Sequence, residues 1–357
     1  QGEWWPISVF CSNCNRDTTE IDDWDGEWGL SYHCETCGFL EKGDLRTLKG
    51  AKLLWRVDWP MRWAYEKVDF EPAGKDHHSQ GGSFDTSKHV VEEVYGRKPP
   101  VTFRYDFIGI KGSPGKMSSS KGKVVDLQDL LRVYQPEIVR YLFAGTRPNT
   151  EFVISFDLDV IKIYEDYDRT ERIYWGVEKA KNEEVEALER RIYELSQVDR
   201  VPEEMPYQIP FRHLCNLLQI HLGNIDAVLS LLPGLKPSQK AHVERRAQCA
   251  WYWITECAPE DFRFFLRKPG ELASLPEAEA AALRRLRDEV VEKLDTYATE
   301  NDIAEAIYAA AQSSNIEPKR LFIAAYQALI GKDQGPRLAG FLKTLGKEKV
   351  LSILKPY

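Results

Sequence analysis

The spacing of apolar residues divides the chain into a front part of short strands and helices and a back part that is helical. Alternating apolar and polar residues predict a half-buried strand at Val101–Ile110, and shorter apolar runs predict strands at Ala51–Val57 and Val68–Ala73. The pattern favours helices at Asp58–Glu66 and from Ser83 to Tyr95. Because strands that alternate with helices usually form parallel sheets with crossover connections, we expect an α/β fold in this part.

The back part places apolar residues at helical spacing. Two helices that divide before Pro136 are predicted within Gln128–Gly145, and a further helix is predicted across Asp157–Trp175. Three prolines mark a linker at Gln197–Pro210. Beyond the linker, the apolar residues of Leu214–Leu232 fit one face of a single long helix, with Gly223 as its weak point. The helices that follow have no constant repeat length, so an all-α bundle or cage is favoured over a regular solenoid.

Seven cysteines include two pairs at a spacing typical of metal sites. Cys11 and Cys14 form one CxxC pair, and Cys34 and Cys37 form a second after nineteen intervening residues. Each CxxC turn directs two thiolates toward one point, and two such turns complete a tetrahedral shell of four cysteines with no open position. We therefore expect a structural zinc ion without a catalytic role, with His33 as a neighbour only. Paired thiols in an odd total also favour a reducing, cytoplasmic compartment over disulfides.

The length and the net charge of the chain limit the classes of protein to which it can belong. A chain of 357 residues that is 43% hydrophobic can form two or three domains. The formal net charge of −8 argues against a protein that holds nucleic acid, DNA in particular, by bulk charge. Local basic patches stay open as binding sites. We expect no membrane partner, because no apolar run approaches the roughly 18 residues of a membrane span, and no basic-then-apolar leader is present.

A segment rich in glycine, serine and lysine, Lys111–Val125 (KGSPGKMSSSKGKVV), follows the predicted strand at Val101–Ile110. Glycines let a backbone approach a ligand closely, and serine hydroxyls and lysines can bind phosphate oxygens. Such a loop suits a triphosphate whose negative charge grows in a transition state. On composition alone, a flexible surface loop is an equal alternative.

Two strings in this chain resemble signatures of one enzyme family. Residues 116–120, KMSSS, resemble the KMSKS signature of class I aminoacyl-tRNA synthetases. Gly74-Lys75-Asp76-His77, followed by Gly81-Gly82-Ser83, resembles the GKDH…GGS segment of class I (archaeal-type) lysyl-tRNA synthetases. The whole chain is similar to the C-terminal two-thirds of that family.

The resemblance implies a domain order. Residues 1–44 would form a zinc-binding insertion, and residues 45–125 the second half of a Rossmann-like catalytic fold with its KMSKS-like loop. Residues 126–200 would form a helical connector that contacts the tRNA stem, and residues 201–357 an α-helical anticodon-binding domain. The fold class is therefore expected to be α/β plus all-α.

The resemblance also implies an activity: lysine is activated with ATP and transferred to tRNA(Lys). Lys116 and Lys121 would be the catalytic residues that stabilise charge on the phosphates. The ATP-binding residues would be Lys116, Met117, Ser118, Ser119, Ser120 and Lys121, with magnesium bridging phosphate oxygens. The lysine pocket would be formed by Trp55, Asp76, His77 and Tyr105. Trp59 and Trp63, at four-residue spacing after Trp55, are interpreted as core residues instead.

Two departures from the family pattern keep alternatives open. Ser119 stands at the fourth position of the signature, where lysine is commonest, so Lys121 would substitute. The chain contains no HIGH motif, which His77-His78-Ser79-Gln80 does not resemble, and it begins where the second half of the fold is expected. We therefore expect this polypeptide alone to activate lysine weakly or not at all. The alternatives are a truncated, non-catalytic tRNA-binding relative and a class I glutamyl-type synthetase.

Overall fold

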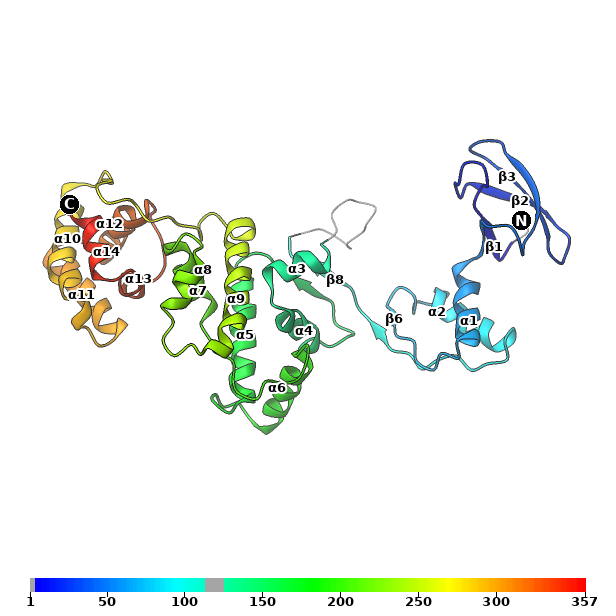
Figure 1. Ribbon diagram of the computed structural model, residues 1–357, viewed down its shortest axis with the longest axis horizontal. Helices are drawn as coiled ribbons and strands as arrows, with labels where there is room; N and C mark the ends of the chain where they lie inside the picture. Colours follow the sequence, from blue (N-terminus) through cyan, green and yellow to red (C-terminus); the bar gives the residue numbers. More distant parts are fainter. Residues whose placement is uncertain (1–3, 113–124) are drawn as a thin grey trace. The chain divides into compact units, whose positions relative to one another are not determined.

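The computed structural model describes residues 4–112 and 125–357, which belong to two compact units (Figure 1). The first unit comprises Gln1–Ile108 and Pro148–Phe152, and the second comprises Gly109–Arg147 and Val153–Tyr357. The chain passes between the units at two strands, Ile108–Ile110 (β8) and Phe152–Ile154 (β9), which form a two-stranded sheet.

The first unit begins with small antiparallel sheets. Strand β3 (Gly29–Cys34) lies between β2 (Thr19–Trp24) and β4 (Leu40–Asp44), and β1 (Ile7–Val9) pairs with β5 (Ala51–Leu53). Alternate side chains of β3 are buried, as expected for a strand with one covered face. A small core of Val9, Leu30 and Tyr32 holds these sheets together.

The rest of the first unit is a strand–helix–strand element. Helix α1 (Trp55–Tyr65) packs on α2 (Ser83–Glu93), and α2 connects β6 (Ala73–Gly74) to β7 (Arg104–Tyr105). Strands β6 and β7 are parallel. The expected parallel pairing with a helical crossover is therefore confirmed here, over strands of only two residues each.

Three predicted strands are wrong in extent. The strand expected at Val68–Ala73 is reduced to an isolated bridge between Phe70 and Val101 and to the two residues of β6. The strand expected at Ala51–Val57 ends at Leu53, because helix α1 already begins at Trp55 and stacks its tryptophans at four-residue spacing. The strand expected at Val101–Ile110 is broken at Asp106, whose backbone N–H donates to the Pro148 carbonyl while its carboxylate accepts from the next backbone N–H. It becomes β7 and β8, which pair with different partners.

The second unit is helical apart from its part of the β8–β9 ribbon. The two helices predicted within Gln128–Gly145, divided before Pro136, are confirmed and are separated by Tyr134 and Gln135; the helix predicted at Asp157–Trp175 is also confirmed. Up to the linker the helices are α3 (Leu127–Val133), α4 (Pro136–Ala144), α5 (Asp159–Tyr174) and α6 (Glu183–Ser196). After the linker come α7 (Phe211–Ile220), α8 (Ile225–Ser230), a 3-10 turn (Pro237–Gln239), α9 (Lys240–Tyr252) and a π-helical turn (Trp253–Cys257).

The single long helix predicted over Leu214–Leu232 is wrong, because the chain breaks between α7 and α8. Leu222 and Gly223 both have positive φ, 51° and 79°, which ends an α-helix. The Trp251 indole fills the position that a side chain at residue 223 would occupy, since a Cβ there would lie 2.4 Å from the ring. Tertiary packing therefore places the break where the sequence showed only a weak point.

A final group of helices encloses one core. It contains α10 (Glu277–Arg285), a π-helical turn (Leu286–Val290), a 3-10 segment (Val291–Thr296), α11 (Glu300–Ser313), α12 (Pro318–Ile330), α13 (Leu338–Leu345) and α14 (Lys347–Leu354). The core includes Leu283, Ile307, Leu329 and Phe341. The irregular packing of these helices agrees with the predicted bundle or cage. In the described part of the chain, no helix is long and apolar enough to cross a membrane.

Candidate active site and metal centre

A row of tryptophans on α1 forms one side of the candidate amino-acid site. Trp59 and Trp63 are 7% and 1% exposed, whereas Trp55, one turn earlier, is 50% exposed. The Trp55 and Trp59 rings stack with centroids 5.1 Å apart. The interpretation of Trp59 and Trp63 as core residues is confirmed, and Trp55 presents an open aromatic face beside them.

His77 lies against this row and is held by the glycine-rich turn that follows it. The edge of its ring meets Trp59 with centroids 5.5 Å apart, and its Nδ1 lies 2.6 Å from the Ser83 Oγ. The turn requires glycine at 82, because a Cβ there would lie 2.5 Å from the His77 carbonyl oxygen. The GGS string therefore brings the Ser83 hydroxyl to the imidazole and fixes one of its nitrogens.

Two other predicted residues meet His77 around Gly74 at the end of β6. A Cβ at residue 74 would lie 2.9 Å from the Asp76 Oδ1, 3.6 Å from Tyr105 and 3.9 Å from His77. Tyr105 is 44% exposed on β7, which pairs with β6, and Asp76 is exposed. The structure thus brings Asp76, His77 and Tyr105 together. Trp55 is linked to this group indirectly, because its ring stacks on Trp59, which contacts His77.

The sequence reasoning missed a charged group beside this cluster. Lys75 of the GKDH string places its Nζ 2.5 Å from the Asp106 Oδ1 and 3.5 Å from the Glu151 Oε2. The ion pair with Lys75 lowers the pKa of Asp106, and it raises the pKa of Lys75 in turn. The position of Asp106 directly after Tyr105 could have indicated that it belongs to the site. Glu151 is too distant in sequence to have been predicted as a partner of Lys75.

His78, beside His77 in the sequence, was not assigned to the lysine pocket, and its contacts indicate a structural role. Its Nδ1 lies 3.1 Å from the Gly74 carbonyl oxygen and its Nε2 lies 3.0 Å from the Thr102 hydroxyl. Its ring stacks on Phe84 with centroids 4.6 Å apart. Both ring nitrogens of His78 have partners within the protein, so His78 connects the turn to the segment that contains Thr102. His77 is therefore the better candidate of the two to contact a substrate.

The predicted ATP-binding residues Lys116, Met117, Ser118, Ser119, Ser120 and Lys121 lie outside the described residues. Both flanks of their segment are described. Lys111 ion-pairs with Asp157 and Asp159 at 2.9 and 2.5 Å. Beyond the segment, Asp126 and Asp129 form a reciprocal capping box at the start of α3. The described residues on either side of the segment, Lys111 and Asp126, therefore both form contacts within the second unit.

The four paired cysteines form a cluster in the first unit. Their sulfur atoms all lie within 4.8 Å of one another, with Cys11 to Cys37 and Cys14 to Cys34 both at 3.6 Å. A tetrahedral zinc–thiolate site with Zn–S bonds of about 2.3 Å requires S···S separations of about 3.8 Å. The cluster therefore fits a metal ion of this kind.

The surroundings of the cluster support thiolate ligands. The Cys14 backbone N–H donates to the Cys11 Sγ at 3.5 Å, and the Asn13 side-chain amide lies 3.6 Å from the Cys37 Sγ. Such N–H donors stabilise negative sulfur and orient it. His33, as expected, is not a ligand: its Nδ1 lies 2.7 Å from the Asp22 Oδ1, and this hydrogen bond raises the pKa of His33.

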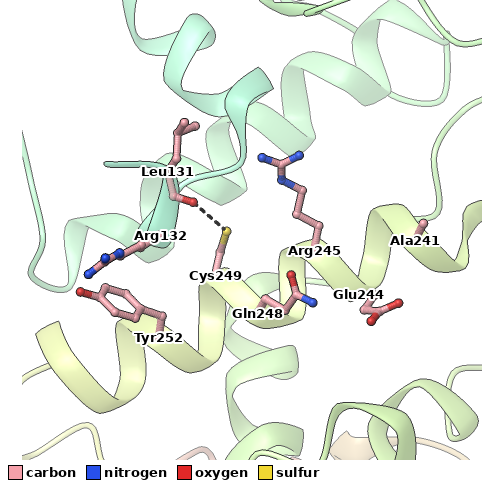
Figure 2. Close-up of a pocket in the computed structure, with 8 residues that line it drawn as sticks. All are labelled: Leu131, Arg132, Ala241, Glu244, Arg245, Gln248, Cys249 and Tyr252. Carbon is pink, nitrogen blue, oxygen red and sulfur yellow. Dashed lines mark hydrogen bonds between the residues drawn. The ribbon is translucent and has the colours of Figure 1, made fainter. Parts of the chain in front are cut away.

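A groove between α3 and α9 lies in the second unit, close in sequence to the lysine- and serine-rich segment (Figure 2). It has a volume of about 490 Å³. The Arg132 guanidinium of α3 faces the Tyr252 ring of α9 at 5.7 Å, and Arg245 and Glu244 line the same groove. The Cys249 thiol lies against the Leu131 carbonyl at 3.8 Å, which joins the two helices.

Comparison with known proteins identifies the family. Residues 1–199 match the family described as tRNA synthetases class I (K), and residues 255–356 match the family described as Anticodon binding domain. The chain is 54% identical over 357 residues to the lysine–tRNA ligase of Treponema pallidum, covering 100% of this chain and 67% of that ligase.

A more distant relative agrees with this match. The lysine–tRNA ligase of Thermococcus kodakarensis is 42% identical over 365 residues, covering 99% of this chain and 68% of that ligase. A solved glutamate tRNA ligase from Elizabethkingia meningosepticum covers 89% of this chain and 63% of its own at 14% identity, but its TM-score of 0.33 carries no argument. The expected catalytic region with a four-cysteine cluster, followed by a helical anticodon-binding domain, is confirmed at that level. The chain belongs to the class I lysyl-tRNA synthetases, of the archaeal and spirochaete type.

Proposed function

We propose that this chain serves in the ATP-dependent ligation of lysine to tRNA(Lys). The observation that carries the proposal is the 54% identity to a lysine–tRNA ligase along all 357 residues. We place the reaction in the cytoplasm, where reduced cysteine pairs are stable. The chain spans 67% of the length of that relative, so the activity is proposed for these residues together with the remainder of such an enzyme.

The first step forms lysyl-adenylate. A carboxylate oxygen of lysine attacks the α-phosphorus of ATP, and the bond to the bridging oxygen of pyrophosphate breaks. This step needs positioning and charge neutralisation more than proton transfer. Lys116 and Lys121 stabilise the charge that accumulates on the β- and γ-phosphates, and the hydroxyls of Ser118, Ser119 and Ser120 bind phosphate oxygens. Magnesium enters with ATP as part of the substrate.

The cluster on the first unit holds the amino acid in this proposal. The Asp76 carboxylate attracts an ammonium group of lysine, and the exposed faces of Trp55 and Tyr105 cover its apolar stem and attract its charge. His77, whose Nδ1 is fixed by Ser83, directs its second nitrogen to the substrate. In the second step a terminal ribose hydroxyl of tRNA attacks the activated carbonyl and releases AMP.

Two further parts of the proposal concern the metal and the tRNA. We assign the four-cysteine cluster to a structural zinc ion, because its geometry fits a closed thiolate shell. The residues 126–200 serve as a connector that contacts the tRNA stem. Arg132 and Arg245, on opposite sides of the groove in Figure 2, suit the phosphates of a backbone that passes across it.

A chimera tests the ligase activity directly. This chain replaces its matched portion of the Treponema pallidum ligase, and transfer of radiolabelled lysine to tRNA(Lys) is measured, with glutamate as the competing amino acid. We expect charging with lysine only. Charging with glutamate would show a glutamyl-type enzyme, and tRNA binding without charging would refute the ligase function.

Variants of the chimera test the assigned residues. His77→Asn removes a hydrogen bond to the substrate, so we expect the KM for lysine to rise about 10-fold with little change in the KM for ATP. Lys121→Ala is expected to lower kcat and to leave the KM for lysine unchanged. His89→Asn, at an exposed position on α2, is the matched control for His77 and should behave as the parent.

A further inference from the structure

The final group of helices contains a hollow that no step above uses. It lies among α11, α12 and the start of α13 and has a volume of about 810 Å³, within the range of small-molecule sites. Its apolar side is formed by Tyr308 of α11 and Phe322 of α12, whose rings meet edge to face with centroids 5.5 Å apart. One side of the hollow is therefore formed by two aromatic rings that pack against each other.

The Tyr308 ring is available to a ligand. Its neighbour Ile307 is 1% exposed and faces the core, whereas Tyr308 is 48% exposed. The Phe322 ring contacts it at nearly a right angle, so Tyr308 is positioned while about half of its surface stays exposed. A large, rigid and half-open aromatic face of this kind is what an unpaired nucleobase stacks on.

Polar groups around the hollow suit the rest of a nucleotide. Lys319 and Arg337 both line it and are exposed, and neither forms an ion pair with any residue in 4–112 or 125–357. The side-chain amides of Asn301 and Gln334 also line it, and each offers a donor and an acceptor to a base edge. Two cations for phosphates and two amides for a base complete a nucleotide-binding set.

The lining also contains carboxylates, which argue against a site that depends on bulk charge. Glu300 and Asp333 balance the two cations, and Asp333 already accepts a hydrogen bond from the Gln327 side chain. A site without net charge selects by stacking and base edges more than by attraction to any polyanion. This favours an unpaired base over a generic stretch of duplex.

We propose that Tyr308, supported by Phe322, is the stacking platform for one unpaired base of the tRNA anticodon loop. Lys319 and Arg337 contact the phosphates that flank this base, and Asn301 and Gln334 face its edge. The proposal rests on the proposed function, in that the chain must bind tRNA(Lys), and on the match of residues 255–356 to an anticodon-binding family. It adds which of these residues meet the RNA.

Binding of RNA hairpins to the whole chain tests the platform. The probe is the anticodon arm of tRNA(Lys), measured by fluorescence anisotropy with the parent chain, Tyr308→Leu and Tyr308→Phe. Loss of one base stack weakens binding about 5- to 100-fold, so we expect this loss for Tyr308→Leu and near-parent binding for Tyr308→Phe. Phe265→Leu, an exposed aromatic of the same matched segment that does not line the hollow, is the control.

Hairpins with one abasic anticodon position identify the base. At the position that stacks on Tyr308, the abasic hairpin should bind the parent and Tyr308→Leu equally, whereas the other abasic hairpins should keep the full difference. Lys319→Gln should reduce the dependence of binding on salt by about one phosphate contact. Equal urea midpoints for all variants exclude a general loss of folding.

The outcomes separate the platform from the proposed function. A parent chain that binds the hairpin no more tightly than Tyr308→Leu overturns the platform and leaves tRNA binding intact. A difference that persists unchanged for every abasic hairpin also overturns it, because the ring would then not meet a base. A parent chain that binds neither the hairpin nor whole tRNA(Lys) overturns the platform and the proposed function together.

Discussion

The buried ion pair between α5 and α9 offers the sharpest test of how the second unit is held together. Arg246 donates two hydrogen bonds to the Asp168 carboxylate, at 2.8 and 2.6 Å, and the two side chains are 2% and 5% exposed. The guanidinium also lies 4.9 Å from the Tyr164 ring centroid. In Arg246→Met the Asp168 carboxylate keeps its buried position and loses its counter-ion.

The size of the effect follows from the burial of the charge. Removing one partner of a buried, hydrogen-bonded pair costs about 3–5 kcal/mol, because the remaining charge is desolvated without compensation. With a urea dependence of about 3 kcal/mol per molar, the midpoint should fall by about 1–1.7 M. Arg245→Met, the adjacent and exposed arginine of the same helix, should change stability by no more than about 0.5 kcal/mol.

Urea unfolding followed by circular dichroism measures these midpoints, and hydrogen exchange of peptides from α5 and α9 locates the change. The double variant Asp168→Leu/Arg246→Met replaces the pair with apolar groups and should recover much of the loss. If Arg246→Met unfolds at the same midpoint as Arg245→Met, the argument from buried charge is wrong. A double variant that is less stable than either single variant would refute it as well.

Three further predictions concern other parts of the molecule. Burial raises the pKa of Glu171 from 4.5 to about 7, so the folded chain favours the protonated carboxyl group. The resulting stabilisation, at most about 3 kcal/mol, is complete below pH 4.5 and is lost as the pH rises through 7. Urea midpoints should therefore show Glu171→Gln to be more stable than the parent at about pH 8 and little different from it at about pH 4.5. Chelation, or Cys34→Ser, should release one zinc ion per chain by mass spectrometry and open residues 4–44 to proteases without changing the helical unit, whereas Cys257→Ser should retain the metal. Gly223→Ala should lower stability by about 1–3 kcal/mol or more through its positive φ and the contact with Trp251, while Gly234→Ala, with positive φ and open space, should lose only about 1 kcal/mol in thermal unfolding.

Local signals in the sequence predicted much of the fold and of the site. The CxxC pairs determine where four sulfurs meet, since each pair is a single turn and the strands between them are short. The helical period over Asp157–Trp175 predicted α5, because its buried residues recur on one face. The GKDH…GGS segment predicted Asp76 and His77 as pocket residues, and this role stays a prediction. The turn between them and α2 is built by its own glycines.

The features that were missed depend on contacts between distant segments. The break at Gly223 is set by Trp251, and the division of the strand at Asp106 is set by the Pro148 carbonyl. The pairing of Asp168 with Arg246 joins residues 78 positions apart, and nothing in either local sequence indicates it. The hollow beside Tyr308 could not be predicted for the same reason. The helical period of α11 predicts which face of the helix is buried, but it does not predict which segments lie next to the exposed face.

The linker at 197–210 separates two stretches of sequence that are nonetheless packed as one body. Tyr164 before the linker stacks on Phe211 after it, with centroids 3.8 Å apart, and the Asp168–Arg246 pair crosses the same junction. Glu203 and Glu204 within the linker are exposed and lie in no helix or strand. We therefore expect two polypeptides divided between these residues to reassemble. A chain ended at residue 200 would instead leave the buried Asp168 carboxylate without its counter-ion and the Tyr164 ring without its stacking partner.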